Sequence, residues 1–307
     1  MRPRIELPAV VLLILMALTA CVGVSKKELQ LLGSSVTPAN VDFVDLQAYA
    51  VRAKTAYAPE AAIRSAFPAT VRVGTPGKTD TQYFVERDDK AKAQYISIRG
   101  TANRENILED IEVKIRSDLR LDIPVHAGFD RTTRIVYDDM KPFLRKNYKT
   151  YIAGHSLGGA IAALLAIYLV EDGYDVERIV TFGQPKFTTT EGVKRVDFLK
   201  LTRVVDRNDI VPMLPPAGIL NRTHGSYQHA GPEIILLDGA RFVYLPTHDA
   251  DRISLGELGR SLNIASLSDH HMDHYLARIG SKTAQAVQVP YDQREKYVAP
   301  GKVAAAP

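Results

Sequence analysis

The feature that most constrains this chain is Tyr151–Val170, YIAGHSLGGAIAALLAIYLV, where one serine stands among glycines ahead of a long apolar run. The residues before the serine are typical of a short buried strand, and Ala160–Val170 is typical of an apolar helix. Glycine two positions to either side of Ser156 gives the backbone room to reverse sharply between the two elements. This Gly-x-Ser-x-Gly context predicts that Ser156 is a nucleophile at the amino end of a helix, where negative charge is favoured.

Two alternatives apply to the same stretch. In the first, the serine hydroxyl serves only as a helix cap, a common role for serine. A glycine-rich loop can also cradle phosphate, but the required Gly-Lys-Ser/Thr sequence does not follow here. The nucleophile hypothesis explains both the strand and the glycines, so we prefer it.

Strands and helices alternate along most of the chain, which favours an α/β fold with a mostly parallel central sheet and helices on both faces. A hairpin signal, Asp238-Gly239, joins the apolar runs of EIILLDGARFVYL and predicts an added antiparallel pair. The expected strands lie at 83–86, 94–98, 111–115, 149–154, 178–183 and 200–205, and the expected helices lie within 42–67, 130–147 and 160–170.

Composition places the chain among soluble globular proteins, since 46% of its 307 residues are hydrophobic and 24% are charged. The formal net charge is +4. No dense block of lysine and arginine marks a nucleic-acid surface, so we expect no nucleic-acid partner.

The amino terminus is typical of a secretory signal: basic MRPR, then the apolar Leu7–Leu18, then the small residues of LTAC. LTAC also resembles the lipobox of bacterial lipoproteins, which implies cleavage after residue 20 and lipidation of Cys21, the only cysteine in the chain. By that resemblance, Val22 favours an outer membrane over retention at an inner one. An uncleaved membrane helix and simple secretion are the alternatives. We therefore expect a signal peptide over 1–20 and a polar connector over 21–40.

Five further segments occur in a fixed order around GHSLGGA: ISIRGTAN, VHAGF, TFGQP, DRNDIVPMLPP and DHHMDHYL. Together they resemble the class 3 lipases, the α/β-hydrolase group that includes the filamentous-fungal triacylglycerol lipases. The resemblance covers roughly Tyr49–Leu276. It implies an α/β-hydrolase domain over 41–280, followed by a loose tail over 281–307. It also implies hydrolysis of carboxylic esters by a Ser–Asp–His triad, without cofactor or metal.

The triad acid and base follow Ser156 in this fold. From position alone, Asp206 and Asp209 are both candidates for the acid, and the family pattern Asn-Asp-x-Val-Pro falls on Asp209, with Asp206 as a loop or capping residue. The family's last motif places the base at His270, with His271 and His274 as rivals.

An oxyanion hole needs donors directed at the developing negative charge. The backbone N–H of Leu157, next to the nucleophile, is one predicted donor. The resemblance to the family's Arg-Gly-Ser/Thr motif implies Thr101 as the other. His126, Arg99 and His229 are interpreted as framework residues with structural hydrogen bonds.

The run HHMDH suggests zinc as an alternative, since His270 and His274 would share one helical face. No His-Glu-x-x-His motif or cysteine pair supplies the remaining ligands, so we expect no metal.

The chain departs from the family in having no tryptophan, which members often carry after the Arg-Gly-Thr motif, and in KFT after TFGQP. The segment where a lid would lie, 103–119, is charged and strand-like, which favours soluble or short-chain esters.

The expected function is hydrolysis of lipid or other acyl esters by a protein anchored to the cell envelope through Cys21. A phospholipase, a phenolic-ester esterase and a non-catalytic envelope lipoprotein are the alternatives.

Overall fold

The computed structural model describes residues 31, 33–101, 115–118, 122–207, 209–215, 220–221, 225–247, 249–250 and 267–298. The signal segment 1–20, Cys21, His224, His248 and most of the expected lid lie outside these ranges.

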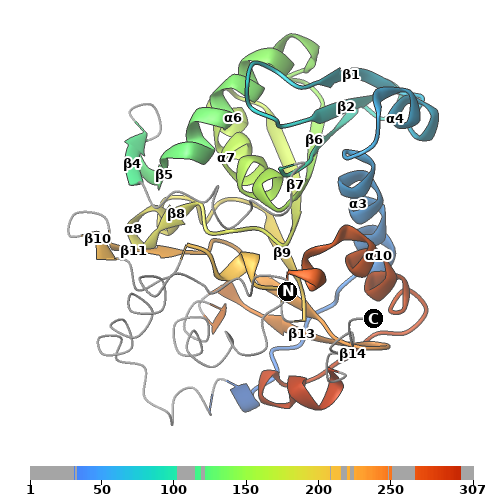
Figure 1. Ribbon diagram of the computed structural model, residues 1–307, viewed down its shortest axis with the longest axis vertical. Helices are drawn as coiled ribbons and strands as arrows, with labels where there is room; N and C mark the ends of the chain where they lie inside the picture. Colours follow the sequence, from blue (N-terminus) through green and yellow to red (C-terminus); the bar gives the residue numbers. More distant parts are fainter. Residues whose placement is uncertain are drawn as a thin grey trace, which may run out of the picture.

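The described chain forms a large sheet and a smaller one, flanked by helices (Figure 1). The strands are β1 (Thr70–Gly74), β2 (Tyr83–Asp88), β3 (Ala93–Ile98), β4 (Ile115–Asp118), β5 (Ile123–His126), β6 (Lys149–His155), β7 (Asp175–Phe182), β8 (Thr188–Thr189), β9 (Leu201–Asp206), β10 (Leu220–Asn221), β11 (Gly225–Gln228), β12 (Glu233–Leu236), β13 (Arg241–Leu245) and β14 (Val287–Gln288). The helices are α3 (Phe43–Thr55), α4 (Glu60–Ala66), α6 (Ala127–Met140), α7 (Leu157–Glu171), α8 (Thr190–Val193) and α10 (Met272–Gly280), with short 3-10 helices η2 (Lys141–Phe143), η3 (Val211–Met213), η4 (Ser268–His270) and η5 (Tyr291–Tyr297).

The large sheet has the order β1-β2-β3-β6-β7-β9-β12-β13-β14. Its centre, β3 to β12, is parallel throughout, and antiparallel pairs flank it on either side. The expected hairpin is confirmed as β12 and β13, with Gly239 at its turn. The small sheet, β10-β11-β8-β5-β4, is antiparallel and was not expected.

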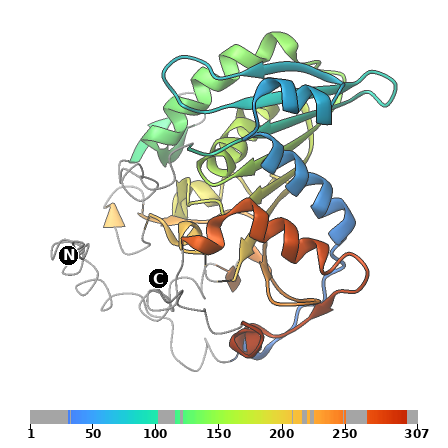
Figure 2. The same ribbon diagram turned by 45° about the vertical axis from the view of Figure 1, so that its right-hand side comes forward.

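Consecutive apolar residues let the central strands bury both faces of the sheet. On β6, Ile152 joins the hydrophobic cluster under α6 and α7, whereas the next residue, Ala153, joins the cluster under α3 and α10. Ile179 and Val180 of β7 divide in the same way. The helix pair α6–α7 thus covers one face and α3–α10 the other, and α3 lies beside α10 (Figure 2, blue and red).

Helix α7 is apolar on all sides, as expected for a helix that is buried on all sides. Its first turn uses glycine because the backbones are in close contact there. A Cβ on Gly154 would collide with the Gly158 backbone, and one on Gly158 would collide with the carbonyls at the end of β3. These two glycines therefore fix how closely the strand, the turn and the helix can pack.

The expectation of a loose tail over 281–307 is wrong for its described part. Residues 281–298 include β14 and η5, and Val289 belongs to a small apolar cluster that Tyr291 and Tyr297 pack against. Gln288 links this segment to the connector by accepting a hydrogen bond from the Ala39 N–H (3.1 Å) and donating to the Thr37 carbonyl (2.7 Å). The tail is ordered here because its apolar side chains cover the edge of the hairpin, which local composition did not indicate.

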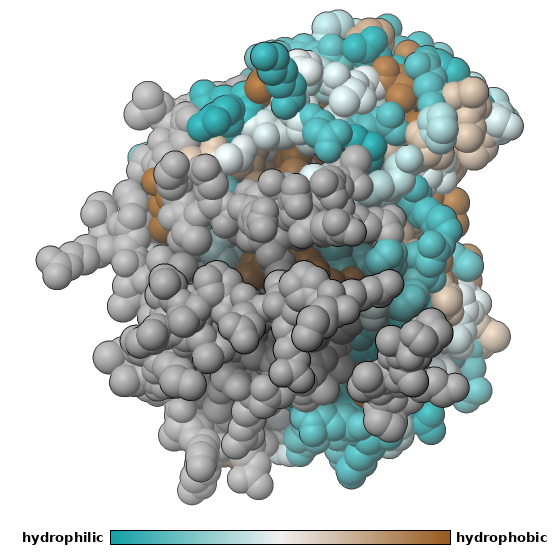
Figure 3. Space-filling view, viewed as in Figure 1, coloured by the Kyte–Doolittle hydropathy of each residue, from teal (hydrophilic) through white to brown (hydrophobic). Residues whose placement is uncertain are grey.

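Among the described helices, none combines the length and the apolar character that crossing a bilayer requires. On the face shown in Figure 3, hydrophobic side chains are visible in a hollow in the middle of the molecule.

Candidate active site

Ser156 occupies the tight turn between β6 and α7. Its backbone has φ 57° and ψ −132°, a conformation that L-residues avoid and that costs of order 1–3 kcal/mol. The Ser156 N–H donates to the Phe182 carbonyl (2.9 Å), which fixes the turn against β7. The side chain is buried, and its Oγ has no hydrogen-bond partner among the described residues. The serine side chain therefore does not cap the helix, which contradicts the capping alternative.

The predicted acid and base come together at the carboxyl end of β9. His270 Nδ1 lies 2.7 Å from Asp209 Oδ2, and both side chains are buried. Asp209 also accepts the Tyr275 hydroxyl on Oδ2 (2.6 Å) and the Val211 N–H on Oδ1 (2.9 Å). Three donors thus compensate the charge of a buried carboxylate.

Sequence analysis assigned no role to Tyr275, and its contact with the acid was not expected. Burial raises its pKa well above the ordinary value, so the phenol keeps its proton and remains a donor.

The contact between Asp209 and His270 Nδ1 determines the tautomer of His270. An Nδ1–H that donates to the carboxylate leaves the Nε2 lone pair available as a base. Like Ser156 Oγ, His270 Nε2 is buried without a hydrogen-bond partner in the described structure. A nucleophile and a base that are to engage a substrate need these atoms unoccupied by other partners.

Gly183 separates the serine turn from the histidine, and sequence analysis did not single it out. It follows Phe182, has φ +56°, and a Cβ built on it would lie 2.7 Å from both Asp209 Oδ2 and His270 Nδ1. Any side chain there would displace the His270–Asp209 pair. Its place in TFGQP, directly after a strand, was the available signal.

The rival histidines have other surroundings. The ring of His271 lies near that of His274, with centroids 6.1 Å apart and the ring planes tilted by 34°. His274 faces Asp269, 3.7 Å from Nδ1 to Oδ1. His229 Nε2 lies 2.7 Å from the Pro212 carbonyl, as expected for a framework residue, and burial lowers its pKa well below the ordinary value.

Both predicted oxyanion donors border the serine. Leu157 begins α7 directly after it. Thr101 follows Gly100, and a Cβ on Gly100 would lie only 2.7 Å from Ser156 Cβ, so this loop passes against the nucleophile.

Lys186, in the KFT segment where the chain departs from the family, supports the acid loop. Its Nζ is buried and donates to the carbonyls of Met213 (2.6 Å) and Pro215 (3.2 Å). Together with His229, it holds the backbone that follows Asp209.

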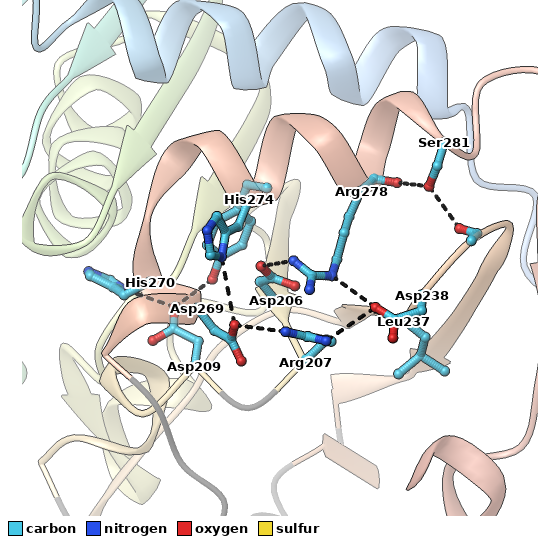
Figure 4. Close-up of polar contacts among 12 residues, drawn as sticks. Asp206, Arg207, Asp209, Leu237, Asp238, Asp269, His270, His274, Arg278 and Ser281 are labelled. Carbon is cyan, nitrogen blue, oxygen red and sulfur yellow. Dashed lines mark hydrogen bonds and ion pairs between the residues drawn. The ribbon is translucent and has the colours of Figure 1, made fainter. Parts of the chain in front are cut away.

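The expectation that Asp206 is a loop or capping residue is wrong. Asp206 ends β9, is fully buried and accepts a hydrogen bond from Arg278 Nη1 (2.7 Å), and this ion pair ties α10 to the sheet (Figure 4). Burial raises the pKa of this carboxyl to about 8, because loss of hydration outweighs the attraction of Arg278.

The helical face required by the zinc hypothesis is not formed, because His270 ends η4 and His274 lies in α10. A different group, Asp206, Asp269 and His274, places three ligand atoms within 4.8 Å of one another. Arg278 and Arg207 already pair with the two carboxylates (Figure 4). Their positive charges oppose a cation, so we interpret this group as an ion-pair network.

Comparison with known proteins identifies similar lipases. Residues 95–219 match the model of the class 3 lipases. A lipase of Caenorhabditis elegans is 35% identical over 126 residues (34% of this chain, 36% of that protein), and the Rhizomucor miehei lipase is 31% identical over 176 residues (52% and 46%). A secreted mono- and diacylglycerol lipase of Fusarium solani is 30% identical over 182 residues (54% and 50%). The chain thus spans half or less of the length of these relatives.

Among solved structures, the lipase of Rhizopus microsporus var. chinensis is similar, with a TM-score of 0.56, 27% identity, and coverage of 66% of this chain and 76% of that one. These matches show the α/β-hydrolase fold.

Replacing Gly183 tests whether the His270–Asp209 pair needs the volume that a glycine leaves empty at this position. In Gly183→Ala the new Cβ displaces His270 from Asp209, and we expect kcat on p-nitrophenyl esters to fall about 100-fold, as for a misplaced catalytic group. Gly173→Ala is the matched control, because Gly173 also has positive φ (+80°) but has no atom within 4 Å of its Cβ position. Equal activity in the two variants would contradict the proposed crowding.

Replacing Asp206 tests the buried carboxyl through the pH dependence of stability. Its pKa rises from 3.8 in the unfolded chain to about 8 on folding, so its proton-linked stabilisation is lost as pH increases between those values. The loss is at most about 1.4 kcal/mol per pH unit. Asp206→Asn does not titrate, so its free energy of unfolding should rise relative to wild type between about pH 5 and pH 8, measured in urea. A difference that does not change with pH would disprove the assignment.

Proposed function

We propose that this chain is a serine hydrolase that cleaves carboxylic esters of lipids, as a triacylglycerol lipase or carboxylesterase. The observation that carries the proposal is the His270–Asp209 pair, which lies beside the strained turn that holds Ser156. The similarity to lipases supports the lipid ester as substrate.

In this proposal each group has a step. Ser156 Oγ attacks the ester carbonyl while His270 Nε2 takes its proton, and Asp209 stabilises the imidazolium that forms. The N–H groups of Leu157 and Thr101 bind the oxyanion. The tetrahedral intermediate collapses as His270 protonates the leaving alcohol, and water then releases the acyl group by the same route in reverse.

A non-catalytic envelope protein is the alternative from another class. It does not account for the strain at Ser156, because a strained backbone costs stability and persists where the surrounding structure holds it for function. A phospholipase or a phenolic-ester esterase would use the same groups on another ester.

Replacing the serine tests the chemistry directly. Ser156→Ala should lower kcat on p-nitrophenyl butyrate by about 10⁴-fold or more and abolish labelling by a fluorophosphonate probe. Ser97 is the matched control, since it is a second fully buried serine whose Oγ has no hydrogen-bond partner in the described structure. Ser97→Ala should keep both activity and labelling. Ester hydrolysis that survives in Ser156→Ala would refute the proposed nucleophile.

We also propose that the protein is anchored to a membrane through lipidated Cys21, which the LTAC sequence supports. Stable attachment needs two or more acyl chains, because a single chain gives only marginal binding. Cys21→Ser should leave the membrane fraction and lose incorporation of labelled palmitate, while esterase activity persists. A wild-type protein that is unlabelled and secreted would favour the alternative, as in the Fusarium solani relative with "secreted" in its name.

A further inference from the structure

We propose that Tyr57 and His155 are positioning residues that hold the backbone of His270 in register with the serine turn and the oxyanion loop. This inference rests on the proposed function and extends it to two residues that do not touch the reacting atoms. His155 is the residue directly before the serine in the Gly-x-Ser-x-Gly motif. Tyr57 lies just after α3, 98 positions before His155 in the sequence.

A continuous chain of hydrogen bonds connects the three segments of the site. The Gly100 N–H donates to the Tyr57 hydroxyl oxygen (2.9 Å). Tyr57 Oη lies 2.7 Å from His155 Nδ1. His155 Nε2 lies 2.8 Å from the backbone carbonyl of His270.

The carbonyl at one end of this chain determines its direction. The carbonyl of His270 only accepts, so His155 Nε2–H donates to it, and in a neutral imidazole His155 Nδ1 then accepts the Tyr57 O–H. This arrangement uses neutral His155 in a single tautomer. Every link then has one donor and one acceptor.

The chain matters because it adds a long-range restraint to the His270 backbone, whose N–H bonds within its own turn, to the Leu267 carbonyl (3.2 Å). His270 is the last residue of η4, a single 3-10 turn, and α10 begins only at Met272. The bond from His155 therefore holds the peptide from which the proposed base projects. It originates one residue before Ser156, so a single side chain couples the positions of nucleophile and base.

Ring contacts support the same arrangement. The centroid of His155 is 4.6 Å from that of His270 and 6.0 Å from that of Tyr275, whose hydroxyl contacts Asp209. The ring of Tyr57 approaches His155 edge-on at 5.7 Å. His155 thus packs against the base and against the donor to the acid, while Gly100, at the other end of the chain, precedes the proposed oxyanion donor Thr101.

Three variants test the proposal on p-nitrophenyl esters. Tyr57→Phe keeps the ring but removes the donor to His155, and we expect kcat to fall about tenfold with KM unchanged, since a misaligned base affects the transition state and leaves ground-state binding intact. His155→Leu breaks both links and should lose about 100-fold in kcat. His155→Gln retains an N–H for the His270 carbonyl and should recover part of that loss.

Tyr168→Phe is the matched control. Tyr168 is also buried, and its hydroxyl donates to Asp130 (2.7 Å), but it lies three turns along α7 from the serine. This variant should lower the melting temperature without changing kcat.

The outcomes separate this inference from the proposed function. Wild type without esterase activity or fluorophosphonate labelling would overturn the function and the inference together. Active wild type with unchanged kcat in Tyr57→Phe and His155→Leu would overturn the positioning role alone. The positioning role would also be overturned if Tyr57→Phe and His155→Leu lost no more kcat than Tyr168→Phe does at an equal loss of melting temperature. It would be overturned as well if His155→Gln were no more active than His155→Leu.

Discussion

The close approach of three backbone segments at the start of α7 is the constraint on which the rest of the site depends. Strand β3, the end of β6 and the first turn of α7 are in contact there without intervening side chains, because Gly154 and Gly158 supply no Cβ. This packing keeps Ser156 in its strained conformation and brings Gly100 against it. Burial of the apolar surface around α7 offsets the free-energy cost of this strained conformation. Without that burial the turn would relax.

Two carboxylates near the end of β9 have opposite roles because their neighbours differ. Asp206 faces the guanidinium of Arg278 in a fully buried position and anchors α10. Asp209, beyond the strand, receives two hydrogen bonds from neutral donors, the Tyr275 hydroxyl and the Val211 N–H, and faces His270. An arginine in the same contact would attract the carboxylate more strongly and weaken its hold on an imidazolium. Keeping the arginines on Asp206 and Asp269 thus leaves Asp209 available to its histidine.

Local patterns in the sequence were enough to predict the order of the central strands and helices and the hairpin at Gly239, since periodicity and turn residues act over a few positions. The pairing of Asp209 with His270 was expected only through the family motif. Position alone left Asp206 equally plausible, because the choice depends on Arg278, a residue 72 positions away. The folded structure of residues 281–298 was missed for the same reason, since it depends on contacts with the hairpin.

The residues that sequence reasoning missed act by shape or through the backbone. Gly183 matters because of the volume it leaves empty, and Lys186 matters because it donates to carbonyls of the acid loop. Neither contributes reactive chemistry, so no spacing rule for catalytic groups identifies them. The same argument applies to His155, whose two nitrogens are both engaged in hydrogen bonds. A side chain that positions a base need not be basic itself, and its identity depends on which backbone atoms the fold brings within its reach.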